Sequence, residues 1–133
     1  MRRKLGELLA ALLDLVVPRW CAGCGHASGD LCAACAPRLA VPRAVARAVP
    51  GLPTVYAAGV YDGPVRAAVI AYKERGRLAL AVPLGTALAR SVDAAAAHAP
   101  PDGRLLLVPV PTTGARRRER GYDPLHHLAA RAV

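Results

Sequence analysis

The sequence has 133 residues, of which 54% are hydrophobic and 20% are charged, a balance that argues against a disordered chain. The apolar residues are mainly Ala, Val and Leu with no Phe, which predicts a thin core because small side chains bury little area. Lys and Arg number 18 against nine Asp and Glu, so the formal net charge is +9. This excess favours phosphorylated ligands or nucleic acid as partners, although heavy Arg use is also typical of GC-rich genomes.

The first segment, residues 2–16, is predicted to be an amphipathic helix that ends before Pro18. Its leucines recur at helical spacing: Leu5, Leu8, Leu9, Leu12 and Leu13. Glu7 and Asp14 interrupt the apolar run, which is too short for a membrane span of about 20 residues. We therefore expect no membrane span here and a cytoplasmic protein rather than an exported one.

The next segment carries all four cysteines in two C-x-x-C pairs, Cys21 with Cys24 and Cys32 with Cys35. Each such turn aims two thiolates at a common point, and two turns close a tetrahedron of sulfurs that suits zinc. A closed four-sulfur site has no vacant position, so we expect the zinc ion to be structural. A redox pair, an iron–sulfur site and free core cysteines are the alternatives, and His26 could replace one thiolate.

The middle of the chain is predicted to alternate between short regular elements and turns. Residues 37–53 contain four prolines and are expected to form a linker. Residues 54–61 suit a strand, and Pro64 suits the first turn of a helix that runs to about Lys73. A second, Ala-rich helix is expected at about 79–97.

The last part of the chain predicts a strand, a loop and a helix in that order. Residues 105–108 are a continuous apolar run, which suits a strand buried on both faces of a parallel sheet. Asp123 and Pro124 suit the N-cap and first residue of the helix. This order is the first half of a βαβ unit, so we predict an α/β fold with a zinc module at 1–40 and a parallel-sheet domain at 41–133.

The loop after this predicted strand is the candidate anion site, because ligands bind at the carboxyl ends of parallel strands. It holds an arginine cluster: Arg116, Arg117, Arg118 and Arg120. Gly121 lets the backbone come close to an anion. A second basic turn, with Lys73 and Arg77, is expected near the same ligand. A solvated basic surface is the alternative for both turns.

Taken in order, these features resemble the ComF family, phosphoribosyltransferase-like proteins tied to DNA uptake in competent bacteria. The stretches that carry the likeness are residues 12–15 with Pro18, the four cysteines, residues 61–66, residues 72–73 with 76–77, and residues 108–111 with Arg116, Arg120, Gly121 and Tyr122. The resemblance implies a zinc-binding module followed by a type I phosphoribosyltransferase fold. Within it, Arg116, Arg120 and Gly121 would belong to a pyrophosphate-binding loop.

The same resemblance implies phosphoribosyl pyrophosphate with Mg²⁺ as a ligand, and single-stranded DNA and a competence helicase as partners. The family's acidic pair and Thr-Thr-Gly phosphate loop are expected beyond residue 133, since residues 108–111, directly before Thr112, Thr113 and Gly114, contain no acid. We therefore expect an incomplete sheet, no phosphoribosyl transfer and no assignable catalytic residue. Asp123 stands where the family has Asn, which places a negative charge beside the predicted site.

Two further functions fit the sequence. One is a phosphoribosyltransferase of nucleotide salvage, which needs the missing phosphate loop. The other is a zinc-ribbon interaction module, in which the helix at 2–16 docks onto a partner protein.

Overall fold

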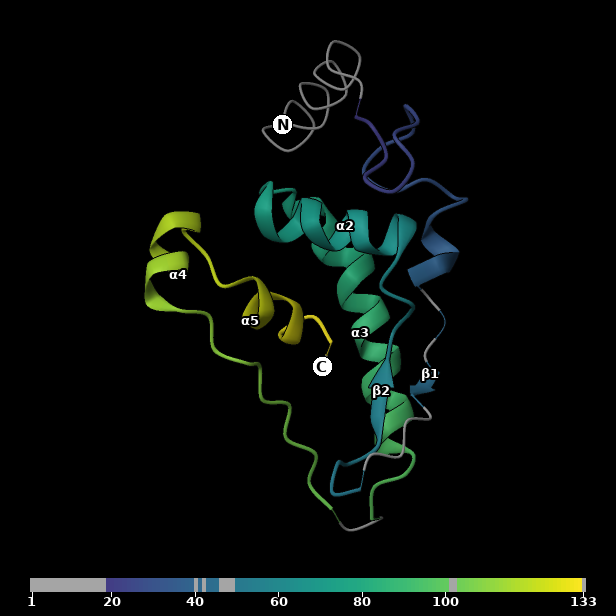
Figure 1. Cartoon of the computed structure of the whole chain (residues 1–133), viewed down its shortest axis with the longest axis vertical. Coiled ribbons are helices and arrows are strands. Elements are labelled where there is room, and N and C mark those ends of the chain that lie inside the picture. The colour runs from purple at the N-terminus through teal and green to yellow at the C-terminus, as the bar shows by residue number, and fades with distance from the viewer. Residues whose placement is uncertain (1–18, 40, 42, 46–49, 101–102, 133) are drawn as a thin grey trace, which may run out of the picture.

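The structure of the chain, a computed structural model, describes residues 19–39, 41, 43–45, 50–100 and 103–132 (Figure 1). The helix predicted at 2–16 lies outside the described residues. The elements in chain order are η1 (Ala36–Leu39), β1 (Arg43–Val45), β2 (Val55–Ala57), α2 (Gly63–Glu74), η2 (Leu78–Leu80), α3 (Ala81–Ala96), α4 (Gly114–Arg120) and α5 (Pro124–Ala129). The described part of the chain is therefore a mixed, mainly helical fold.

Helix α3 is the centre of this fold. It packs against η1, β2 and α5, and its buried face carries Ala81, Leu84 and Ala87. Gly85 permits the close approach of the C-terminal segment, because a Cβ there would lie 2.9 Å from the Cβ of Arg131. The run Leu78–Ala96 is long and apolar enough to cross a membrane by length and composition, a test that core helices also pass. Of its 18-residue apolar window 33% is buried in the structure, including the face that packs into the core.

Tyr72 is the main link between α2 and α5. Its side chain is fully buried, and its hydroxyl donates a hydrogen bond to the carbonyl oxygen of Pro124 at 3.1 Å. Because that single proton is used, the same oxygen accepts from Nδ1–H of His127 at 3.0 Å. Tyr122 completes the cluster by donating its hydroxyl proton to the Tyr72 carbonyl at 2.6 Å. The buried core consists mainly of small side chains, as the composition predicts, and Tyr72 is its one buried aromatic residue among the described residues.

Helices α2, α3 and α5 occur where the sequence predicts them, with small differences at their ends, whereas residues 114–120, which were predicted to be a loop, form helix α4. Helix α2 begins at Gly63 with Pro64 in its first turn, and α3 follows a short 3-10 turn that begins at Leu78. Asp123 caps α5, since its Oδ1 accepts from the backbone N–H groups of Leu125 at 3.1 Å and His126 at 3.2 Å. These elements depend on local signals such as caps, prolines and periodicity.

The predicted parallel sheet is not found among the described residues. The strand expected at 54–61 is reduced to β2, which pairs with β1 in an antiparallel sheet of two strands, with Tyr56 opposite Ala44. Residues 105–108 form no strand, although the backbone there runs extended (Figure 1). A strand needs a neighbour to satisfy its backbone, and no backbone hydrogen bond joins residues 105–108 to another described segment. The linker predicted at 37–53 contains β1 and all but the first residue of η1.

Candidate functional site

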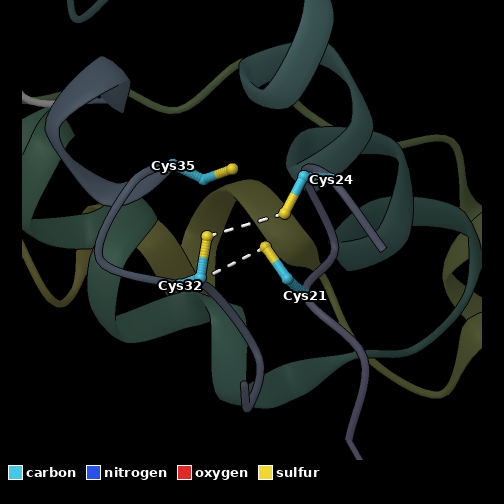
Figure 2. Close-up of side chains that lie close together, drawn as sticks. All are labelled: Cys21, Cys24, Cys32 and Cys35. Atoms are coloured by element: carbon cyan, nitrogen blue, oxygen red, sulfur yellow. Dashed lines mark hydrogen bonds between the residues drawn. The ribbon is translucent and has the colours of Figure 1, made fainter. Parts of the chain in front are cut away.

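The four predicted ligands Cys21, Cys24, Cys32 and Cys35 converge on one point (Figure 2). Their Sγ atoms all lie within 4.8 Å of one another, and the Sγ atoms of Cys24 and Cys32 are 3.6 Å apart. A tetrahedral zinc ion with Zn–S bonds of about 2.3 Å places its sulfurs about 3.8 Å apart. All four cysteines are unbridged thiols. The cluster could therefore hold a metal ion such as zinc.

Two glycines allow the first C-x-x-C turn to fold. Gly25 has φ +78°, and its N–H bonds the Cys21 carbonyl at 2.9 Å. At Gly23 the reason is space, because a Cβ there would come within 2.9 Å of the Cys35 Sγ and 2.8 Å of the Pro64 Cβ. The second turn closes through the Cys35 N–H, which bonds the Cys32 carbonyl at 3.0 Å. The sequence therefore shapes the cluster through backbone geometry and through close packing on α2.

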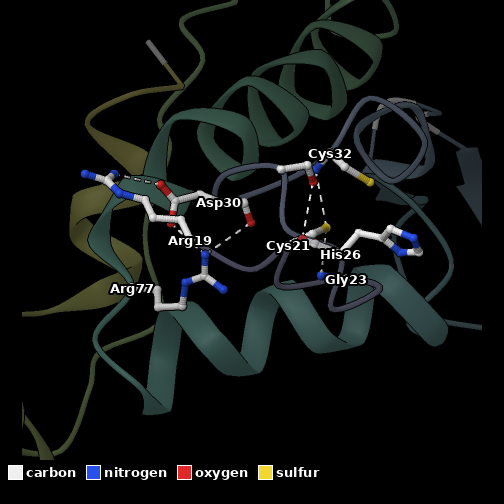
Figure 3. Close-up of polar contacts among 8 residues, drawn as sticks. Arg19, Cys21, Gly23, His26, Asp30, Cys32 and Arg77 are labelled. Atoms are coloured by element: carbon white, nitrogen blue, oxygen red, sulfur yellow. Dashed lines mark hydrogen bonds and ion pairs between the residues drawn. The ribbon is translucent and has the colours of Figure 1, made fainter. Parts of the chain in front are cut away.

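The electrostatics of the cluster differ from one thiol to the next. Burial raises the pKa of Cys21, but backbone N–H groups outweigh this effect and lower it to about 6. Two of these donors are the N–H groups of Cys32 and Gly23, whose nitrogens lie 3.3 and 3.4 Å from Sγ (Figure 3). Burial and the neighbouring thiols raise the pKa of Cys35 to about 12. A metal ion bound here would favour the deprotonated form of all four thiols.

His26 does not join the cluster. Its side chain is exposed, and its residue takes part in the turn through its carbonyl oxygen, which accepts the Cys21 N–H at 2.7 Å. Among the described residues, the four cysteine sulfurs form the group that could hold a metal ion.

Asp30 joins the cysteine segment to the helical core (Figure 3). Its carboxylate pairs with Nη2 of Arg77 at 2.6 Å and with Nη1 of Arg19 at 3.3 Å. Burial raises the pKa of Asp30, but the two arginines outweigh this effect and hold it below its usual value. The sequence analysis missed Asp30, and it assigned Arg77 to the anion site. In the structure Arg77 contacts Asp30, on the side of the cysteine segment.

Three of the predicted anion-binding residues line one cavity of about 450 Å³ between the end of α2 and α4. These cationic residues are Lys73, Arg116 and Arg120, and two acidic residues, Glu74 and Glu119, share the lining. Arg120 is held in place by Glu74, because its Nη2 lies 2.6 Å from Oε2 of that residue. The cavity thus offers both charged donors and carboxylate oxygens.

Gly121 and Asp123 do not line this cavity. They determine the backbone conformation beside it. Gly121 ends α4 in the left-handed conformation, with φ +74°. The Oδ1 atom of Asp123 accepts from the Thr112 hydroxyl at 3.1 Å in addition to capping α5. The carboxylate of Asp123, which was expected beside the anion site, therefore holds Thr112 against the start of α5.

Comparisons with family models, with curated proteins and with solved structures give no match to this chain. The class that the described geometry defines is a mainly helical protein with a four-cysteine cluster that could hold a metal ion such as zinc.

Proposed function

We propose that this chain is a ComF-like protein that holds a structural zinc ion and binds the phosphate groups of phosphoribosyl pyrophosphate or single-stranded DNA. The observation that carries the proposal is the convergence of Lys73, Arg116 and Arg120 on one cavity. Two of them lie on α4 and one lies at the end of α2, so the fold gathers charges that are more than 40 residues apart in sequence. The ComF resemblance supplies the ligand class.

The zinc ion has a structural role in this proposal. Four thiolates complete its tetrahedron, so no position is open for water or substrate. The ion would cross-link residues 21–35, and this segment continues into η1, whose Leu39 is buried in the core beside α3. Paired C-x-x-C zinc ligands are more typical of reducing compartments than disulfides are, which fits the proposed cytoplasmic location.

The donor set of the cavity suits a phosphate better than an apolar ligand. Guanidinium groups form bidentate hydrogen bonds to phosphate oxygens, and the Lys73 ammonium adds a point charge. An incoming phosphate would compete with Glu74 for Arg120. Glu74 and Glu119 supply carboxylate oxygens, the ligand type that Mg²⁺ accepts, so the lining also suits a magnesium diphosphate.

The proposed activity of this chain is binding and not phosphoribosyl transfer, since no catalytic group is assigned. In the setting that the resemblance suggests, the protein would handle incoming single-stranded DNA beside a competence helicase. A transferase of nucleotide salvage would instead turn over phosphoribosyl pyrophosphate with a base. A zinc-ribbon interaction module would bind neither ligand.

The test is calorimetric titration of the zinc-loaded protein with phosphoribosyl pyrophosphate and, separately, with a single-stranded oligonucleotide. Changing Arg116 and Arg120 together to Ala should weaken binding roughly tenfold or more, because two charged hydrogen-bond donors leave the cavity. The matched control changes Arg117 and Arg118 to Ala, which removes the same charge from α4 outside the cavity lining. Equal losses in both variants would reduce the interaction to nonspecific charge attraction and contradict the proposal.

A further inference from the structure

Trp20 is a large aromatic residue that the cysteine segment leaves open to solvent. It is 58% exposed, whereas Cys21, the next residue, is 3% exposed. The backbone is extended at this point, where Trp20 and Ala27 form an antiparallel β-bridge. Side chains alternate between the two faces of an extended backbone. Arg19 and Cys21 therefore turn toward the ion pair and the cysteine cluster, and Trp20 turns toward solvent.

The backbone that carries Trp20 is held on both sides. The Cys21 N–H bonds the His26 carbonyl at 2.7 Å, and the Gly29 N–H bonds the Arg19 carbonyl at 3.1 Å. The alanine opposite Trp20 in the bridge is exposed and is too small to cover an indole ring. The structure thus presents a flat aromatic ring on an ordered backbone, so little further ordering is needed when a ligand stacks on it.

Contacts between neighbouring residues link Trp20 to the cavity that is proposed to bind phosphate. Arg19 precedes Trp20 in the chain, and its Nη1 pairs with Asp30 at 3.3 Å. The same carboxylate pairs with Nη2 of Arg77 at 2.6 Å (Figure 3). Gly76, the residue before Arg77, lines the cavity. The exposed ring and the cationic cavity are therefore joined through the turn at residues 76–77.

We propose that the indole of Trp20 stacks on an unpaired base of single-stranded nucleic acid whose phosphates contact the cationic cavity. This inference rests on the proposed binding of single-stranded DNA and adds a base-binding position to it. The net charge of +9 favours a polyanion as the ligand. A protein partner would need a larger apolar patch, whereas residues 26–28 beside the ring are His, Ala and Ser.

Stacking and charge should contribute differently to binding. Every base has a face that can stack on an aromatic ring, so the contact at Trp20 should raise affinity with little sequence preference. Phosphoribosyl pyrophosphate carries no base, so its binding should not depend on Trp20. The two proposed ligands therefore separate the role of the ring from the role of the cavity.

Trp20 is the only tryptophan in the sequence, so its fluorescence reports this contact directly. Titration of the zinc-loaded protein with single-stranded oligothymidylate should quench the emission, because a base stacked on the indole quenches it. An abasic oligonucleotide of the same length carries the same phosphate charge and should bind without this quenching. Equal quenching by the two oligonucleotides would overturn the proposal. Emission that acrylamide cannot quench in the free protein would also overturn it, because the ring would then be covered.

Substitutions measured by anisotropy of a labelled oligothymidylate supply the second test. Trp20→Ala should weaken binding roughly fivefold or more, and Trp20→Phe should restore most of the affinity. Tyr61→Ala is the matched control and should keep full affinity, since Tyr61 is 60% exposed and lies outside the cysteine segment. Zinc content verifies that each variant is folded.

Salt titrations separate the ring from the charges. Trp20→Ala should leave the slope of log K against log salt unchanged, whereas changing Arg116 and Arg120 together to Ala should reduce it. Unchanged oligothymidylate affinity in Trp20→Ala, or a loss of phosphoribosyl pyrophosphate binding in that variant, would overturn the stacking contact alone. An unmodified protein that binds no oligonucleotide would overturn both this contact and the proposed binding of DNA.

Discussion

The cysteine segment at 19–39 and the extended segment at 104–112 differ in whether their polar groups find partners within the chain. In the first, thiols, backbone donors and an ion pair converge within a short stretch, and Asp30 anchors the result to Arg77. In the second, a strongly apolar run has no backbone partner in the described part of the chain. The contrast shows that local spacing, together with glycines and packing on α2, can bring four cysteines together, whereas a strand depends on a neighbour that its own sequence does not encode.

Removal of the metal should have the largest effect on the stability of the cysteine segment, because structural zinc supplies about 10 kcal/mol or more in comparable small sites. We expect chelation, or Cys35→Ser, to unfold residues 19–39 and to loosen η1 from α3. Hydrogen exchange with and without chelator measures this loss. His26→Ala is the control and should keep a full complement of zinc, and zinc loss in that variant would contradict the four-thiolate assignment.

Loss of the Tyr72 hydroxyl should be the next largest effect. Tyr72→Phe leaves the buried Pro124 carbonyl without its donor, which should cost about 1–3 kcal/mol of unfolding free energy. Chemical denaturation measures the change, and Tyr61→Phe, at a tyrosine that is 60% exposed, is the control. Equal stability of the two variants would show that the cluster of Tyr72, Tyr122 and His127 does not hold α5.

The same tyrosine predicts a pH dependence. Burial raises the pKa of Tyr72 from 10.0 to about 12, so the folded state favours the neutral phenol. The contribution of Tyr72 to stability is therefore complete below pH 10 and is lost as the pH rises toward 12. Tyr72→Phe should flatten this alkaline decline in denaturation midpoint, whereas Tyr61→Phe should keep it.

The ion pair between the two regions should contribute less. Asp30→Asn removes a partly exposed carboxylate from Arg77 and Arg19, which should cost about 1 kcal/mol at low salt and less at high salt. Thermal melts at two salt concentrations measure this cost. Asp93→Asn, at an exposed position on α3, should change little at either concentration. A salt-independent loss at Asp30 would assign its role to packing rather than charge.

The smallest loss of stability is expected on substitution of Glu74. The same substitution should strengthen ligand binding. Glu74→Gln should cost less than about 1 kcal/mol, since the carboxylate is half exposed. It should tighten phosphate binding severalfold, because Arg120, with only 13% of its side chain exposed, loses its competing partner. Glu119→Gln removes a charge from the same lining, and a gain as large in that variant would contradict a specific role for Arg120.

What the sequence predicts correctly depends on how local each interaction is. The cysteine spacing predicts the cluster, and Pro64 and Asp123 predict the starts of α2 and α5, because each signal acts within a few residues. The pair of Asp30 and Arg77 spans 47 residues and has no local signature. A single acid between two C-x-x-C turns is the signal that could have drawn attention to it.

The prediction of a parallel sheet was wrong because pairing between strands is not a local interaction. The sequence shows that residues 105–108 are a continuous apolar run, but it cannot show whether a second strand lies beside them. Arg116, Arg120 and Lys73 were selected for their charge, and the fold brings these three to one cavity while Arg77 pairs elsewhere. The phosphate ligand remains a prediction for the titrations.

X-ray absorption at the zinc edge of the purified protein tests the metal centre most directly. Our account predicts one zinc ion per chain with four sulfur ligands at about 2.3 Å and no nitrogen or oxygen in its first shell. A protein that retains no zinc after purification under reducing conditions, or a shell with fewer than four sulfurs, would contradict it.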